Sequence, residues 1–511
     1  MTELISKLST LSPMNVYRAI KTMREGLRRS VSIERNDEDR EHLNGFDRLT
    51  AVAMGRDLNR NSSKAITILN QRAALTVAEV KAQFNSSDPD WNKAANFYFN
   101  NTFARDCYYR TPEHLAQVAE WVELAKIREG DILVVFDDFL TGSGKLLLWE
   151  ADQLVSVVAG DWEQQTLYCD NTPDGKKAMF QQDGVVRDQF GKVVAYTVIR
   201  DNPADKNTRG RVTAPLADVT IVPAESARLV RHTFRPGQVR GVPVLLPVSD
   251  DLADIEDMVK SELATAKTRS KIMAFVKHSA EEMERIENKA FLKAIAERTG
   301  EDNTEDQQVV KRSRYRQLEE GLGGIVEYCD DGDTIDIPGV DRPNLDVGTF
   351  FNFAGDNAGA ALGLAQGYTR MAVAGSYTAH RGETCLTFRH IRREQKKHEH
   401  DWLDWLAVKV VEFAIDAGKL PAGPESWQGS ISWRMPSADV IDPQKEAAAE
   451  QQDMKNGKRN LRDIIGPDWK EKLEETAEIL AFAREKGVPL SMFETVAGAA
   501  AEIGTELEEE Q

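Results

Sequence analysis

A cluster of glycine and proline residues divides this chain of 511 residues into two different parts. Residues 235–243 hold two glycines and two prolines, which the interior of a helix does not tolerate. From Ser249 to Ala280 neither residue type occurs, and apolar side chains recur with a helical period. At 1.5 Å per residue, roughly 28 residues of helix in this stretch make a rod of about 42 Å. A rod of this length needs a partner, so we expect it to pack against another rod or another copy of the chain.

The part before this cluster changes from helical to β-rich. Residues 1–90 are polar with a helical rhythm, and Thr111–Pro112 is the expected start of another helix. Residues 128–235 hold four strand-like runs, and the first two flank a Gly-Ser-Gly turn, which predicts a hairpin. The four runs are residues 131–136, 145–149, 193–199 and 218–222. Helices and strands in separate segments indicate an α+β fold.

The part after the long helix is again mostly helical. Residues 281–345 are charged and rich in turns, and a second helix is expected to begin near Gly348. The glycines within residues 371–384 predict a mobile loop. Another long helix is expected from Thr384 to Asp416, and the C-terminal residues after the Asp442-Pro443 pair are expected to be helical.

Composition excludes several classes of protein. The 65 lysines and arginines against 83 aspartates and glutamates give a net charge of −18, which excludes a coat protein that is basic overall. The four cysteines lie far apart and form no C-x-x-C pair, which argues against a disulfide scaffold or a zinc ribbon and favours a reducing compartment. These are Cys107, Cys169, Cys329 and Cys385. The sequence has no signal-peptide pattern and no apolar window of membrane-spanning length, so a soluble protein without a membrane partner is expected.

Motifs for catalysis and cofactor binding are absent from the sequence. Gly142–Lys145 resembles a phosphate-binding loop, but Phe139 and Leu146 stand where that loop needs Gly and Ser or Thr, so a hairpin turn is predicted. His390, Glu394 and His398 share one helical face, yet the H-E-x-x-H motif is absent and five cations surround them. We therefore expect a solvated charged face there. No catalytic residue, cofactor or metal ligand is expected.

Seven short motifs follow one another in a fixed order over about residues 50–490. The most specific lies within Val230–Pro243 and reads Arg-x-Gly-Gln-x-Arg-Gly-Val-Pro from Arg235 onward. Tyr377–Arg381 aligns with a Tyr-Ser-Ser-Ala-Arg signature, with Thr378 and His380 in place of Ser and Ala. The remaining five are Arg56–Asn61, Leu148–Leu154, Gly184–Tyr196, Trp433–Pro436 and Asp442–Glu446. Together they resemble the lambda-type family of tailed-phage portal proteins.

The resemblance implies a portal fold, in which named parts surround a channel. A wing of helices and strands is followed by a two-helix stem, a clip, a tunnel loop with a long helix behind it, and a helical crown. The implied ranges are 1–248 for the wing, 249–280 for the first stem helix, 281–345 for the clip, 346–370 for the second stem helix, 371–384 for the tunnel loop, 385–442 for the long wing helix and a strand, and 443–511 for the crown.

The same resemblance implies a function as head-tail connector. Portal subunits form a ring, usually of twelve, at the capsid vertex of the virion after assembly in the host cytoplasm. Double-stranded DNA passes through the ring without sequence specificity during terminase-driven packaging and during ejection. The implied partners are the terminase large subunit, the major capsid or scaffold protein and a head-completion or neck adaptor protein. A net charge of −18 per subunit would repel the duplex and let it slide.

Two groups of site residues follow from the resemblance. Tyr377, Thr378, His380 and Arg381 are expected to line or flank the DNA channel in the tunnel loop. The basic residues of the clip are expected to face the terminase, although a solvated basic face remains the alternative. These are Lys311, Arg312, Arg314 and Arg316.

Two rival functions remain open from the residues alone. One is a packaging ATPase or nuclease subunit, and the other is a different capsid or tail-adaptor ring protein. The first lacks a phosphate-binding loop with an acidic magnesium ligand. The order of long helix, loop and long helix after a β-rich half favours a portal over the second.

Overall fold

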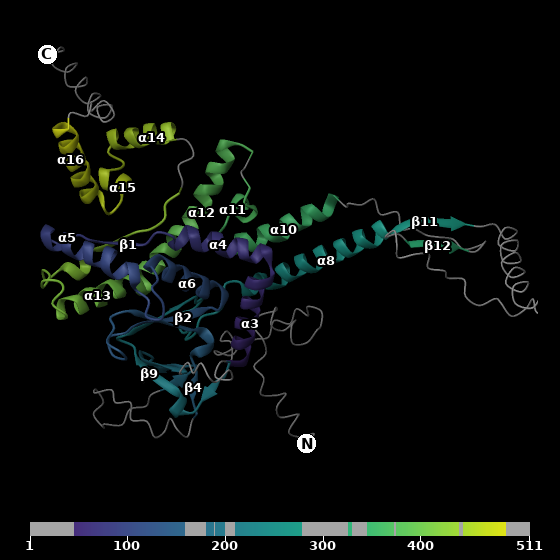
Figure 1. Cartoon of the computed structure of the whole chain (residues 1–511), viewed down its shortest axis with the longest axis horizontal. Helices are drawn as coiled ribbons and strands as arrows, with labels where there is room; N and C mark the ends of the chain where they lie inside the picture. Colours follow the sequence, from purple (N-terminus) through teal and green to yellow (C-terminus); the bar gives the residue numbers. More distant parts are fainter. Residues whose placement is uncertain are drawn as a thin grey trace, which may run out of the picture. The chain divides into compact units, whose positions relative to one another are not determined.

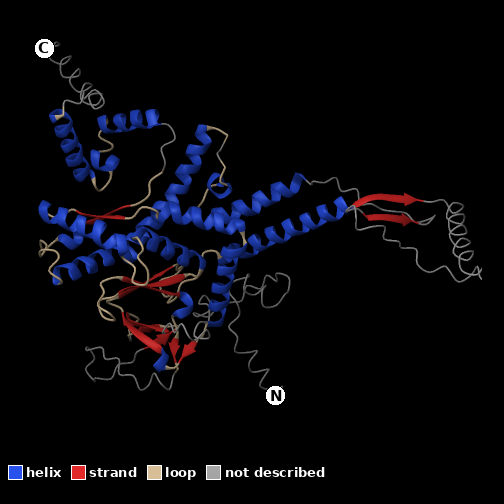
Figure 2. Cartoon of the chain, in the orientation of Figure 1, coloured by secondary structure: helices blue, strands red, loops and turns tan. Residues whose placement is uncertain are grey.

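The computed structural model describes residues 45–158, 180–188, 190–199, 210–277, 325–329, 345–372, 375–438 and 443–486 (Figure 1). The chain divides into two compact units, one formed by residues 1–249 with 356–511 and the other by residues 250–355. Both helices and strands are present (Figure 2), so the mixed α+β class predicted from the sequence is confirmed. Among the described helices, none has the length and apolar character that crossing a bilayer requires.

The element bounds follow the labels of Figure 1. The helices are α3 (Gly45–Asn61), α4 (Ser63–Val77), α5 (Pro89–Phe97), η1 (Tyr98–Phe103), η2 (Ala104–Asp106), α6 (Leu115–Arg128), η3 (Ala151–Gln153), η4 (Leu216–Asp218), η5 (Leu246–Val248), α8 (Ser249–Lys271), α10 (Leu345–Ala361), α11 (Gln366–Arg370), α12 (Tyr377–His398), η6 (Glu399–Leu403), α13 (Asp404–Asp416), η7 (Trp427–Ser430), α14 (Pro443–Lys455), α15 (Leu461–Ile465) and α16 (Trp469–Glu485). The strands are β1 (Lys81–Phe84), β2 (Asp131–Phe136), β3 (Leu146–Glu150), β4 (Ser156–Val157), β5 (Phe180–Gln182), β6 (Val185–Arg187), β7 (Val193–Ile199), β8 (Thr213–Ala214), β9 (Val219–Pro223), β10 (Ala227–Arg231), β11 (Ile272–Lys277), β12 (Ile325–Cys329) and β13 (Ile431–Arg434).

Strand β2 is buried on both faces, which explains why its sequence is continuously apolar rather than alternating. It is the central strand of the sheet β10-β2-β3. Successive side chains of a strand point to opposite faces. Ile132, Val134 and Phe136 therefore enter a core formed with helices, whereas Leu133 and Val135 enter a second core against the sheet β5-β6-β7-β9.

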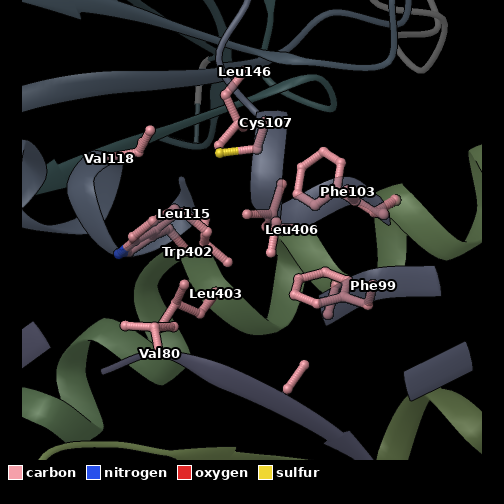
Figure 3. Packing of buried hydrophobic residues seen from close by; sticks show 14 of the residues in the cluster. Val80, Phe99, Phe103, Cys107, Leu115, Val118, Leu146, Trp402, Leu403 and Leu406 are labelled. Carbon is pink, nitrogen blue, oxygen red and sulfur yellow. The ribbon is translucent and has the colours of Figure 1, made fainter. Parts of the chain in front are cut away.

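The helical core joins segments from both ends of the larger unit. Phe99 and Phe103 from η1 pack with residues of η6 and α13, among them Trp402, Leu403 and Leu406 (Figure 3). Trp402 is fully buried, and its indole N–H donates to His398 Nδ1 at 2.9 Å. The pairing of β1 with β13 closes the same core, since Ala82 lies opposite Trp433. Residues distant in sequence thus share one hydrophobic interior.

The smaller unit contains α8, and Figure 1 draws this helix as one uninterrupted rod. The sequence prediction of a helix to Ala280 is wrong at its end. Helix α8 stops at Lys271, and residues 272–277 form β11, which pairs in parallel with β12. β-Branched and aromatic residues in Ile272–Lys277 favour a strand once a partner strand is available.

The hairpin prediction is confirmed, because β2 and β3 pair in antiparallel fashion around the Gly142–Lys145 turn. Gly142 and Gly144 both have a φ of +65° there, and the Asp137 carboxylate accepts hydrogen bonds from the Leu140 and Thr141 amides at 3.0 Å. The strands expected at residues 193–199 and 218–222 are also present, as β7 and β9.

Two predicted helix starts are wrong. Helix α6 begins at Leu115 rather than at Pro112, because His114 Nδ1 accepts a hydrogen bond from the Ala116 amide at 3.1 Å and caps the helix. Helix α12 begins at Tyr377 rather than at Thr384, because the Ser376 hydroxyl accepts from the Ala379 amide at 3.2 Å. Gly382 lies within α12 with open space around it. The prediction of a loop over residues 371–384 therefore fails for residues 377–384.

Candidate functional site

The motif at Arg235–Pro243 forms a buried clamp on the start of β2. The Arg240 guanidinium makes a two-pronged ion pair with Asp131, with Nε 2.6 Å from Oδ2 and Nη2 2.8 Å from Oδ1. The Gly241 amide donates to the same carboxylate at 2.8 Å. Both side chains are almost completely buried, and Arg240 also donates to the carbonyl oxygens of Asp183 and Ala151. One arginine thus ties the motif to three other segments.

Gly241 is required by the close approach of two backbone segments. A Cβ atom at this position would overlap the carbonyl oxygen of Gly130. Gly237 lies four residues earlier in the same motif, and a Cβ atom there would have nothing within 4 Å. The two glycines of the motif therefore have different roles, and only Gly241 is fixed by packing.

A second arginine joins two other motifs. Arg56 of α3 donates to both oxygens of Asp152 at 2.9 Å and to Glu129 at 3.0 and 3.1 Å, and its Nη2 lies 3.2 Å from Glu150. Burial alone would lower the pKa of Arg56, but the hydrogen bonds with Asp152 and Glu129 outweigh it and raise the pKa. Glu150 and Asp152, the Glu-x-Asp of the Leu148–Leu154 motif, therefore accept hydrogen bonds from Arg56, the first residue of the Arg56–Asn61 motif.

A network of buried ionisable groups joins α4, α6 and α12. Glu123 of α6 lies at its centre, with its Oε1 3.2 Å from Arg72 Nε and its Oε2 2.6 Å from His398 Nε2. Lys126 pairs with Glu123 and, at 3.4 Å, with Glu394. All five side chains are at most 5% exposed. Buried charges of this kind persist only when each is paired.

The charges within this network fix the protonation of its members. Burial by itself would raise the pKa of Glu394, but Lys126, Lys397 and Arg72 outweigh it and lower the pKa to about 2. Burial and then the charge of Lys126 lower the pKa of His398. Since His398 Nδ1 accepts from Trp402, the neutral ring carries its proton on Nε2 and donates it to Glu123.

The lowered pKa of His398 predicts a loss of stability on acidification. Below pH 6.5 the unfolded histidine binds a proton that the folded one does not, so the free energy of unfolding falls as the pH decreases. Between pH 7 and 5.5 the wild type should lose about 1 kcal/mol more than a His398→Gln variant, which has no titrating group. Urea unfolding across this range measures the difference. Parallel pH curves for the two proteins would contradict the prediction.

The sequence prediction of a solvated face at His390, Glu394 and His398 is wrong for two of these residues. Glu394 and His398 are buried, and His390 is half-buried. The prediction failed because the acidic and basic partners come from helices more than 260 residues away in sequence. A signal was present, since Arg72 and Lys126 interrupt apolar stripes of α4 and α6 at positions that face inward.

The predicted channel residues lie in the first two turns of α12. Thr378 and Arg381 are exposed, whereas Tyr377 and His380 are half-buried. The Lys445 ammonium of α14 lies 5.0 Å from the centre of the Tyr377 ring, so the motif at Asp442–Glu446 meets the motif at Tyr377–Arg381. The structure thus places the four residues on one short helical segment rather than in a loop.

Several contacts tie the residues around α11 to α4 and to α12. Arg72 donates to the Leu362 carbonyl, and Lys64 donates to the Thr369 carbonyl at 2.9 Å. The Tyr368 hydroxyl lies 3.2 Å from the Thr384 hydroxyl, which joins α11 to α12. The buried network therefore holds α12 in place while the α11 region is tied to α4.

Two further features of the sequence are the predicted clip residues and the Gly142–Lys145 motif. Lys311, Arg312, Arg314 and Arg316 lie outside the described residues. Gly142–Lys145 forms the hairpin turn that the sequence predicted. Among the described residues, no group of three or more His, Cys, Asp or Glu side chains is placed to hold a metal ion.

The comparison with known proteins identifies the family. A family described as phage portal protein, lambda family, matches residues 25–395, which is 371 of the 511 residues. No curated protein sequence matches the chain. Among solved structures 54 chains match, including one from the virion of a native gene transfer agent particle, with 12% identity over 88% of this chain and 97% of that chain and a TM-score of 0.41.

The family match rests on sequence and covers well over half of the chain. It includes the Arg240 clamp, the Arg56 contacts and the segment at the start of α12. Phage portal proteins are structural rather than enzymatic, and they form oligomeric rings with the capsid in the virion. This chain therefore belongs to the lambda family of phage portal proteins.

Proposed function

We propose that this protein forms the ring through which double-stranded DNA enters the capsid during packaging and leaves it during ejection. The family match over residues 25–395 is the observation that carries the proposal. A ring of about twelve subunits, at the portal vertex of the virion and assembled in the host cytoplasm, agrees with that family. The net charge of −18 per subunit supports a conduit, because a channel through acidic subunits attracts phosphates weakly.

The parts of the portal are assigned to the chain as follows. Residues 1–248 form the wing, 249–280 with α8 are the first stem segment, and 281–345 are the clip. Residues 346–370, which hold most of α10 and all of α11, are the second stem segment. Residues 371–384 are the tunnel segment, 385–442 are the long wing helix with β13, and 443–511 are the crown. The division of the chain at residues 249–250 and 355–356 supports treating residues 250–355 as a separate module.

In this proposal the exposed side chains at the start of α12 face the DNA. Thr378 and Arg381 contact phosphates, while Tyr377 and His380 flank them. One arginine per subunit provides limited contact, which steadies a duplex without binding it tightly. Contacts to phosphates carry no sequence information, so the ring accepts any duplex.

Replacing Arg381 by glutamate tests this assignment. The expected result is about tenfold less packaged DNA, because a ring of carboxylates would repel the duplex. Complementation of a phage that lacks its own portal gene, with DNA per capsid as the readout, measures the effect. Lys419→Glu, an exposed cation beyond the end of α13, is the matched control. Intact rings with normal DNA content in the Arg381 variant would contradict the assignment.

The remaining partners are assigned to the clip and the wing. Lys311, Arg312, Arg314 and Arg316 contact the terminase large subunit, and the neck adaptor binds the same clip after packaging. The major capsid or scaffold protein holds the wing at the vertex.

The rival proposal is a packaging ATPase. The sequence contains no phosphate-binding loop to support it. Hydrolysis of ATP by the purified protein would be evidence for this rival function.

A further inference from the structure

An exposed basic stripe runs along α12. Its members follow the spacing i, i+3, i+4, i+7 and therefore share one helical face. They are Arg389, Arg392, Arg393 and Lys396, all exposed. Lys396 pairs with Glu399, whereas the three arginines form no ion pair within the described residues. Three unpaired guanidinium groups on one face indicate a surface that an acidic partner covers.

An acidic stripe with the same spacing lies on α16. Its members are Glu471, Glu474, Glu475 and Glu478, all exposed. Glu474 pairs with Lys93 at 2.8 Å, and the other three form no ion pair within the described part of the chain. The two stripes have equal length and opposite charge. When the two stripes are aligned in antiparallel fashion, Arg389 lies opposite Glu478 and Arg392 lies opposite Glu475. The other two cations, Arg393 and Lys396, lie opposite Glu474 and Glu471.

Helix α16 is also left largely uncovered by the described part of the chain. Of its seventeen residues, all described, only Ala483 is buried. Ile479 and Phe482 are 54% and 62% exposed beside the acidic stripe. On α12, Leu386 is 62% exposed and lies one turn before Arg389. The antiparallel alignment brings Leu386 to the level of Phe482, so apolar surface meets apolar surface where the charges end.

We propose that the basic stripe of α12 binds the acidic stripe of α16 on the neighbouring copy of this chain. The inference rests on ring assembly, which the family implies, and not on passage of DNA. A ring is closed by two different surfaces that complement each other, and these stripes form such a pair. Duplex DNA would fit the basic stripe alone, but it would repel the acidic stripe and leave Ile479 and Phe482 exposed. A second copy accounts for both surfaces.

A charge-swap cycle on the full-length chain tests the proposal without DNA. One variant carries Arg389→Glu and Arg392→Glu, a second carries Glu475→Lys and Glu478→Lys, and a third combines all four. These positions avoid the Lys93–Glu474 pair. Each reversal should raise the subunit concentration needed for half-assembly at least about tenfold, and the combination should return it to near the wild-type value.

The measurement is the ring fraction by native mass spectrometry over a range of subunit concentrations, with thermal unfolding as the check on folding. Lys419→Glu is again the matched control, since it changes an exposed charge outside both stripes. Two reversed variants that form rings like the wild type would overturn the proposal. So would a combined variant that fails to recover, or an α12 reversal that leaves rings intact and weakens only their binding to DNA.

Cys385 provides a second readout on the same surface. Its exposed thiol lies one turn before Arg389. The proposed contact covers it, so alkylation of Cys385, located by peptide mass mapping, should be several-fold slower in rings than in subunits of the reversed variants. Equal rates would overturn the proposal. Failure of the DNA conduit would instead appear in the Arg381→Glu test, with assembly unchanged.

Discussion

Replacement of Glu123 by glutamine is expected to lower the free energy of unfolding by about 3–5 kcal/mol, which is typical for breaking a buried ion pair from one side. Glutamine keeps the shape of the side chain but removes the negative charge at the centre of the network. Arg72 and Lys126 would then share Glu394 alone, and all of them are buried. Two cations without sufficient countercharge are costly in a medium of low polarity.

Urea and thermal unfolding of the purified chain measure this effect. Glu120→Gln is the matched control, because Glu120 lies on the same helix and is half-buried, and among the described residues it accepts a hydrogen bond only from Gln117, at 3.2 Å. Its replacement should change stability by less than about 0.5 kcal/mol. Equal stability of the two variants would show that the network is not a source of stability. Because the network also holds α12, the Glu123 variant should in addition expose α12 to proteolysis.

Gly241→Ala is expected to have the second largest effect, a loss of about 3 kcal/mol. The added methyl group would overlap the carbonyl oxygen of Gly130, which is backbone and has no rotamer to escape into. The strand end at Asp131 must then shift, and the Arg240–Asp131 pair loses its geometry. Two effects thus add at one position.

The control for this substitution lies within the same motif. Gly237→Ala introduces the same atom into open space and should change stability by less than about 1 kcal/mol. The urea unfolding midpoints of the two variants, measured side by side, show whether Gly241→Ala loses more stability than Gly237→Ala. A Gly237 variant as unstable as the Gly241 variant would mean that the motif needs glycine for backbone freedom and not for close packing.

Local sequence signals predicted β2, β3, β7 and β9, because each of these strands carries its signal within a few residues. β7 and β9 are rich in β-branched residues, and the hairpin of β2 and β3 has two glycines at its turn. The start of α12 could not be predicted in this way. The glycines of residues 371–384 suggested a loop, whereas the Ser376 cap and the contacts of α11 with α12 favour a helix.

The candidate site was predictable only in part, for a similar reason. The motifs around Arg56, Arg240 and Tyr377 were found in the sequence, but their partners come from distant segments. The buried network escaped prediction because a helical charge pattern does not show which face a neighbouring helix will cover. Glu394 is separated from Lys126 by 268 residues.

The pairing of β1 with β13 has a consequence for biosynthesis. Ala82 and Trp433 lie opposite each other across about 350 residues of chain. A ribosome that adds roughly 5–20 residues per second needs roughly 20–70 s to make that intervening length. During this time β1 is synthesised but its partner does not exist, and the helical core beside it lacks η6 and α13. The nascent chain therefore emerges with an open strand edge next to unburied aromatic residues, and its solubility on the ribosome depends on what shields that edge until Trp433 arrives.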